Sequence, residues 1–122
     1  MKSYRDLDVY VLSHSLAVKI HGESMRLPKY ELYESGSQIR RASKSISANI
    51  VEGYGRRQYK ADYVRFLVIA HASCDETHEW VEYIIDCHPD HAEAWKPLLS
   101  EVEELGRKLY RFIQAVEAGH KV

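Results

Sequence analysis

Three side chains that can bind a metal or transfer a proton share one predicted helical face near the middle of the chain. His71, Cys74 and His78 are spaced at i, i+3 and i+7, which brings them to one side of a helix. A structural zinc ion needs a fourth ligand, and Cys87 or the histidines that follow it would reach the ion only if the chain folded back. Solvent-facing histidines on an acidic helix and a cysteine in the core account for the same residues, so the sequence predicts no metal site.

The sequence lacks the patterns of nucleophilic catalysis and nucleotide binding. Ser13, His14 and Ser15 lie in a regular helical pattern, without the elbow, oxyanion loop or orienting acid that an activated serine needs. Gly53-Tyr54-Gly55 follows a predicted helix rather than a strand, and it lacks the lysine and hydroxyl residue of a phosphate-binding loop. We expect these glycines to end the helix with positive φ angles. The sequence predicts neither an enzyme nor a cofactor.

Basic side chains gather in the middle of a chain whose formal net charge is only −1. Residues 38–65 carry seven basic groups against two acidic ones, residues 70–105 carry ten acidic groups against one lysine, and residues 106–122 are again basic. Local charge decides which partners are attracted. The alternative to a phosphate-binding surface is pairing of these cations with acidic neighbouring helices or subunits. The candidate phosphate contacts are Arg40, Arg41, Lys44, Arg56, Arg57 and Lys60, with Arg65 as a further one.

A polar stripe runs beside the core stripe of the helix predicted over residues 31–53. The core stripe is Ile39, Ala42, Ile46 and Ile50, and the polar stripe lies roughly 100° away around the helix. Polar groups next to a core favour hydrogen bonds between helices or subunits rather than catalysis. We therefore expect helix-packing or interface roles for the polar residues Gln38, Ser45, Asn49 and Glu52. We expect the same kind of role for Gly53 at the end of this helix.

Apolar periodicity predicts four helices that position these groups, at about residues 7–27, 31–53, 60–86 and 91–118. The last is the most regular, because its apolar residues alternate steps of three and four. These residues are Trp95, Leu98, Val102, Leu105, Leu109, Phe112 and Val116. Such a heptad repeat is typical of shallow-angle bundle packing, and short connections then predict an all-α, antiparallel up-down-up-down four-helix bundle.

Length and composition predict one domain over residues 1–122. The chain has 122 residues, of which 45% are hydrophobic, enough for a single core. Leu99, Tyr110 and Ile113 widen the apolar stripe of the last helix, which predicts that part of it faces another subunit. No apolar run is long enough for a membrane span, and the first residues lack the apolar core of a signal peptide. We expect a cytoplasmic protein without membrane contact, in which both cysteines are free.

Most of the chain resembles a known bacterial family. The stretches that carry the resemblance are Asp6-Leu7-Asp8-Val9-Tyr10 followed by Ser13-His14, Leu27-Pro28-Lys29-Tyr30-Glu31-Leu32, the whole of Gln38–Arg57, Arg65-Phe66-Leu67-Val68-Ile69-Ala70 followed by Ser73 and Glu76, and Glu104-Leu105-Gly106-Arg107. They are similar to the four-helix bundle proteins encoded by intervening sequences in 23S ribosomal RNA genes. Ala72 and Thr77 depart from that pattern, as does the stretch 87–97.

The resemblance implies a ring-like homopentamer related in fold to the accessory protein of diversity-generating retroelements. That protein partners a reverse transcriptase and nucleic acid through a basic surface, so the resemblance implies RNA or DNA binding here. Tyr54, Tyr59 and Tyr63 are candidates for stacking on unpaired bases, although tyrosine more commonly packs in a core or interface. The alternative function is a structural or protein-interaction module without a nucleic-acid role.

Overall fold

The computed structural model describes residues 2–119, and these fold into four long helices. Three short 3₁₀ segments accompany the helices, and the described residues contain no β-strand. The helices are α1 (Asp8–Ser24), α2 (Ser35–Gly55), α3 (Lys60–Cys87) and α4 (Ala92–Glu117), and the 3₁₀ segments are η1 (Tyr4–Asp6), η2 (Lys29–Tyr33) and η3 (Pro89–His91). The prediction of an all-α chain with four helices is confirmed. None of the described helices is both long and apolar enough to cross a membrane.

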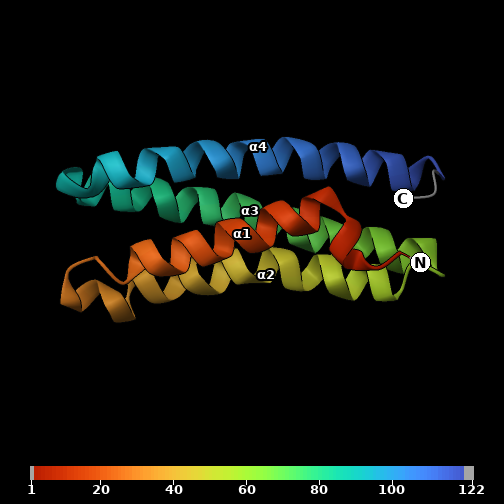
Figure 1. Ribbon diagram of the computed structural model, residues 1–122, viewed down its shortest axis with the longest axis horizontal. Helices are drawn as coiled ribbons and strands as arrows, with labels where there is room; N and C mark the ends of the chain where they lie inside the picture. Colours follow the sequence, from red (N-terminus) through yellow and green to blue (C-terminus); the bar gives the residue numbers. More distant parts are fainter. Residues whose placement is uncertain (1, 120–122) are drawn as a thin grey trace.

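The four helices lie side by side along the long axis of the molecule (Figure 1). The ends of α2 and α4, the start of α3 and the N-terminal segment lie at the same end of the bundle (Figure 1). Ring contacts agree with this arrangement, because the Tyr63 ring lies 6.3 Å from that of Tyr54 and 6.2 Å from that of Phe112, centroid to centroid. Residues distant in sequence are therefore neighbours at this end.

The apolar face of α4 packs into the core of the bundle. Six of its seven predicted core positions are buried, but Phe112 is only partly buried and Ile113 takes its place in the core. An ordinary α-helix drifts by about 20° per heptad relative to a strict seven-residue repeat, so the buried position near the helix end moves by one residue. Ile113 is therefore not on the outer part of the stripe, and Leu99 also packs against the core of its own chain, whereas Tyr110 is exposed.

Gly53 does not end α2. The helix continues to Gly55, and Gly119 is the one residue with positive φ in the described part of the chain. The expectation that Gly53 and Gly55 adopt positive φ is therefore wrong. A Cβ atom on Gly53 would lie 3.1 Å from Phe66 Cβ and 3.3 Å from the carbonyl oxygen of Tyr63. Gly53 instead allows α2 and α3 to approach closely.

Candidate nucleic-acid interface

Three of the exposed cations predicted from the sequence lie in the turn between α2 and α3 or at its border with α3. Residues 56–59 reverse the chain, and the Arg56 carbonyl accepts a hydrogen bond from the Tyr59 amide at 2.9 Å. Arg56, Arg57 and Lys60 are all exposed. Because two long helices hold both ends of this short turn, its side chains project from a fixed backbone.

Arg56 and Arg57 lie against aromatic rings at this turn. The Arg57 guanidinium lies 4.0 Å from the centroid of the Tyr54 ring, and its Nη1 donates to the Tyr54 carbonyl at 2.9 Å. Arg56 lies 4.9 Å from the Phe66 ring, while its Nε is 3.0 Å from a Glu52 carboxylate oxygen. Stacking fixes a guanidinium but keeps its charge, so Arg57 presents an oriented cation whereas the charge of Arg56 is partly offset.

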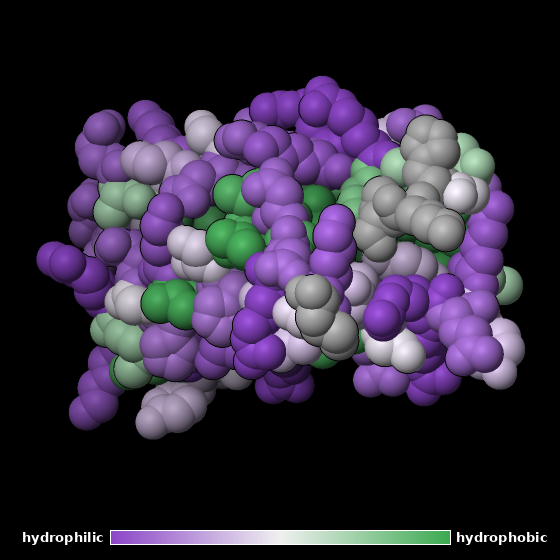
Figure 2. Space-filling view, turned by 45° about the vertical axis from the view of Figure 1, so that its right-hand side comes forward, coloured by the Kyte–Doolittle hydropathy of each residue, from purple (hydrophilic) through white to green (hydrophobic). Residues whose placement is uncertain are grey.

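The last turns of α4 add cations to the same end. Arg111 lines a hollow of about 520 Å³ together with Lys2 from the N-terminal segment. Lys108 lines it too, but its Nζ lies 3.3 Å from a carboxylate oxygen of Asp8. Figure 2 turns this end forward and shows hydrophilic residues over most of the face, with small hydrophobic groups between them. We call the exposed cations here the basic end: Lys2, Arg5, Arg56, Arg57, Lys60, Arg65 and Arg111.

Arg41 and Lys44 form a separate part of the predicted surface. Both are exposed on the middle of α2, and Lys44 is roughly 18 Å along the helix axis from Arg56 at the usual rise per residue. Lys44 lines a hollow of about 410 Å³ between α1 and α2, together with His14 and His21. The exposed predicted cations therefore lie in two places, the middle of α2 and the region of the α2–α3 turn, rather than in one patch.

Arg40 is held within the subunit. Its Nη2 donates to the Leu32 carbonyl at 2.6 Å, and its Nη1 donates to Ser24 Oγ at 2.9 Å. These bonds join α2 to η2 and to the end of α1. The Arg40 side chain is half-buried there, so its charge is not free to contact a phosphate on the surface.

The polar stripe of α2 meets α3 at Ser73. The hydroxyl oxygens of Ser45 and Ser73 are hydrogen bonded at 2.9 Å, and Asn49 Nδ2 donates to the carbonyl and the hydroxyl of Ser45. Gln38 is exposed on the first turns of α2, whereas Glu52 pairs with Arg56 as described above. The sequence did not predict Ser73 as the hydrogen-bond partner of Ser45. A polar stripe on one helix does not show which residue of another helix it will contact.

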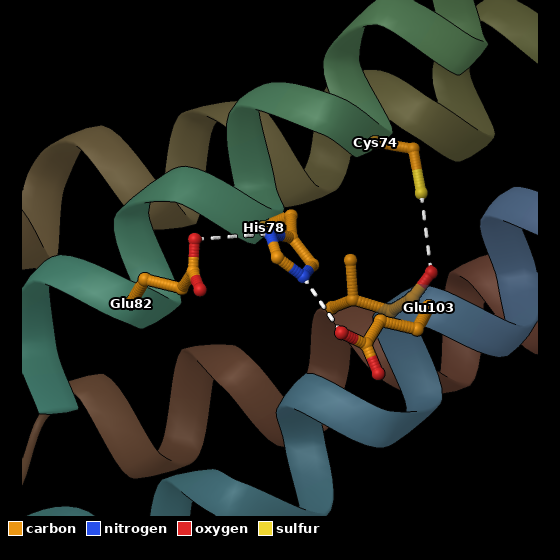
Figure 3. Close-up of polar contacts among 5 residues, drawn as sticks. Cys74, His78, Glu82 and Glu103 are labelled. Atoms are coloured by element: carbon orange, nitrogen blue, oxygen red, sulfur yellow. Dashed lines mark hydrogen bonds and ion pairs between the residues drawn. The ribbon is translucent and has the colours of Figure 1, made fainter.

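His71, Cys74 and His78 do not converge on one point. His78 lies between two carboxylates, with Nδ1 3.4 Å from Glu82 and Nε2 2.9 Å from Glu103 (Figure 3). The Cys74 thiol donates to the Val102 carbonyl at 3.5 Å, and burial raises the pKa of this thiol to about 12. The thiol therefore stays protonated near neutral pH. Within residues 2–119, no three histidine, cysteine or acidic side chains are arranged to hold a metal ion.

Sequence reasoning also missed Lys2, Arg5 and Arg111 as members of the basic end. The signal for Arg111 was the return of positive charge after residue 105. The sequence alone does not show that Arg111 lies near the α2–α3 turn, because this depends on the packing of α4 beside the start of α3. The short N-terminal segment gave no comparable signal, because its acidic and basic residues balance.

Comparison with known proteins places the chain in a family. The sequence model described as 23S rRNA-intervening sequence protein matches residues 5–111. No curated protein matches the chain significantly. The chain is 27% identical to a protein with unknown function from the S23 ribosomal protein family of Bacteroides thetaiotaomicron VPI-5482, with a TM-score of 0.75 over 86% of this chain and 97% of that one. The predicted resemblance is confirmed, and the chain belongs to the family of 23S rRNA-intervening sequence proteins.

Proposed function

We propose that this protein binds RNA or DNA without catalysing a reaction, and that the basic end contacts the phosphates. The observation that carries the proposal is the meeting of Arg57 and Lys60 with Arg111 from α4 at one end of the bundle. Among residues 2–119, no carboxylate lies within ion-pair distance of these three cations. Cations without a carboxylate partner can exchange counterions for phosphates, which is the main source of sequence-independent affinity.

The chemistry of the basic end suits phosphate oxygens. A guanidinium offers N–H donors in a planar fork, and Arg57 keeps its orientation through the Tyr54 ring. Lys60 and Arg111 add charge from two other helices. Arg41 and Lys44 extend the proposed surface along α2, so a strand longer than a few nucleotides can contact both parts.

Self-association would multiply this surface, and we propose that antiparallel up-down-up-down subunits assemble into a ring-like homo-oligomer, a homopentamer by family resemblance. Val11 and Val18 on α1 and Met25 directly after it are exposed at steps of seven residues, and α3 exposes Val68 and Ile69 elsewhere on the surface. Two different apolar faces suit a contact in which one face of each subunit meets the other face of the next. Contacts of that kind form a closed ring when the rotation between neighbouring subunits divides a full turn evenly.

The alternative, a protein-interaction module without nucleic acid, draws support from the same apolar faces. In that case the basic end meets the acidic second half of α3 in a neighbouring subunit or partner. Arg56 already forms ion pairs of this kind within the subunit, with Glu52 and Asp62.

One triple variant separates the two readings. Replacing Arg57, Lys60 and Arg111 by glutamine removes three positive charges per subunit from exposed positions. Binding of labelled RNA and DNA at two salt concentrations is expected to weaken, and the dependence of affinity on salt is expected to become less steep. Native mass spectrometry is expected to give the same assembly as the parent. A variant that falls apart supports the alternative.

A matched control removes the same charge from elsewhere. Arg26, Lys29 and Lys96 are exposed away from the basic end, and their replacement by glutamine changes the net charge equally. Nucleic-acid affinity is expected to fall much less than in the first variant. Equal affinity of the parent and the first triple variant for RNA and DNA would exclude the basic end as the contact surface.

A further inference from the structure

We infer that Tyr59 is a base-stacking residue that makes the basic end prefer unpaired over duplex nucleic acid. The inference rests on the proposed function and names the kind of nucleic acid that fits. Tyr59 is the last residue of the α2–α3 turn, between Arg57 and Lys60 in the sequence, and 64% of its surface is exposed. An aromatic face and phosphate-binding cations are thus presented within one short turn.

The other two candidate tyrosines are not available for stacking. Tyr54 is 8% exposed and Tyr63 is 4% exposed, and both belong to the core cluster. Their rings meet edge to face, and Tyr63 also meets Phe112 in this way. Burial raises the pKa of the Tyr63 hydroxyl to about 12, in keeping with a residue closed off from solvent. Of the three, only Tyr59 can meet a base.

Neither helix capping nor core packing explains a tyrosine at position 59. Tyr59 is the N-cap of α3, and its side chain makes no capping hydrogen bond. Serine, threonine, aspartate and asparagine are the residues that stabilise a helix start. Within residues 2–119, the Tyr59 ring has no aromatic neighbour and does not join the core cluster. The ring therefore serves neither the helix nor the core.

The backbone at Tyr59 is nevertheless fixed. Its amide donates to the Arg56 carbonyl at 2.9 Å, and its carbonyl accepts from the Tyr63 amide at 3.0 Å. Little backbone conformational freedom is therefore lost when a base stacks on the exposed ring. A stacked base would bring its flanking phosphates among Arg56, Arg57 and Lys60.

The preference for unpaired strands follows from access to the faces of the bases. In a duplex both faces of an internal base are covered by its neighbours, so a surface ring can meet only phosphates and groove edges. In a single strand a base can leave its neighbours and stack on tyrosine. The cations alone would bind both forms, whereas the ring adds affinity for the single strand alone.

The test compares Tyr59→Ala and Tyr59→Phe with the parent protein. The probes are a single-stranded RNA, a single-stranded DNA and a DNA duplex of the same sequence, at one salt concentration. Tyr59→Ala is expected to weaken single-strand binding roughly 5- to 100-fold and duplex binding by less than about twofold, and Tyr59→Phe is expected to bind as the parent does. Fluorescence of a 2-aminopurine base in the strand is expected to be quenched by the parent and by Tyr59→Phe but not by Tyr59→Ala.

Salt dependence and a control separate stacking from charge. The salt slope of Tyr59→Ala is expected to equal that of the parent, because stacking releases no counterions. Tyr33→Ala removes an 85% exposed tyrosine from η2 and is expected to change no affinity. Unchanged single-strand affinity in Tyr59→Ala, or equal weakening for strand and duplex, would overturn the inference and leave the proposed function standing. A parent protein that binds none of the probes would overturn both.

Discussion

His88 Nε2 and Glu31 Oε2 lie 2.7 Å apart although 57 residues separate them in the sequence. The side chains are 9% and 8% exposed, so the contact is buried. It joins η2, which connects α1 to α2, to the end of α3. The second carboxylate oxygen of Glu31 accepts a hydrogen bond from the Ser35 amide at 3.3 Å, at the start of α2. One carboxylate therefore holds two connections of the bundle together.

The Glu31 carboxylate predicts a loss of stability in acid. Burial alone would raise the pKa of Glu31, but hydrogen bonds from His88 and Ser35 outweigh it and hold the pKa below its ordinary value of 4.5. A carboxyl whose pKa is lower in the folded state stabilises the fold above the unfolded pKa, and this stability is lost as the pH falls through the folded pKa. Melting temperatures from about pH 6 to about pH 3 are expected to fall more steeply for the parent than for Glu31→Gln. Parallel curves would remove Glu31 from the acid response.

Breaking the pair from the other side is expected to destabilise the fold more than removing both partners. His88→Leu leaves the buried Glu31 carboxylate without its side-chain partner, at a cost of about 2 to 4 kcal/mol in the free energy of unfolding. The double variant Glu31→Leu/His88→Leu is expected to lose less stability than His88→Leu alone, and therefore less than the two single variants together. Urea unfolding of all four proteins gives the coupling energy, and a coupling of zero would contradict the contact.

Two neighbouring glycines are expected to respond oppositely to alanine. A Cβ atom at Gly53 would press on Phe66 Cβ and the Tyr63 carbonyl, neither of which lies at the end of a flexible side chain, so Gly53→Ala is expected to cost about 1 to 3 kcal/mol. At Gly55 no atom lies within 4 Å of the added Cβ, and Gly55→Ala is expected to be neutral or to stabilise α2 by up to about 1 kcal/mol. Thermal unfolding measures both variants. Equal effects would show that close approach is not what requires Gly53.

Adjacent residues of α4 test the register of its buried face. Leu109 is fully buried, and Leu109→Ala is expected to cost about 2 to 5 kcal/mol through the cavity that it leaves. Tyr110 is exposed, and Tyr110→Ala is expected to stay within about 0.5 kcal/mol of the parent. The free energies of unfolding come from urea titration. A small loss at Leu109 together with a large one at Tyr110 would place the wrong face of α4 in the core.

Local patterns in the sequence are enough to predict the helices and most of their buried faces. Trp95, Leu98, Val102 and Leu105 are buried as the periodicity of α4 predicted, and Ile39, Ile46 and Ile50 are buried on α2. This succeeds because helical periodicity is local, and because apolar residues repeated on one side of a helix have to be covered. The family was also readable from the sequence, since its motifs are contiguous stretches.

The helix boundary near residue 31 depends on contacts between segments that are distant in the sequence. Sequence periodicity placed the start of the second helix there, but α2 begins at Ser35 and Lys29–Tyr33 forms a 3₁₀ segment. Glu31 turns inward to His88, and the Glu31 carbonyl lies so close to Gly36 that a Cβ there would be 2.7 Å away. The partner of Glu31 is 57 residues away, and the close approach of two backbone segments has no sequence pattern of its own. The local sequence therefore does not indicate that the helix starts later.

The basic end was likewise decided by the way the helices pack. The sequence located Arg57 and Lys60 in one basic segment and Arg111 in another, and the bundle brings both segments to the same end. Periodicity reports which side of a helix is buried but not which distant residue lies opposite. Only the packing of α4 beside the start of α3 places these cations together, because that neighbourhood depends on the directions of the helices and the lengths of their connections.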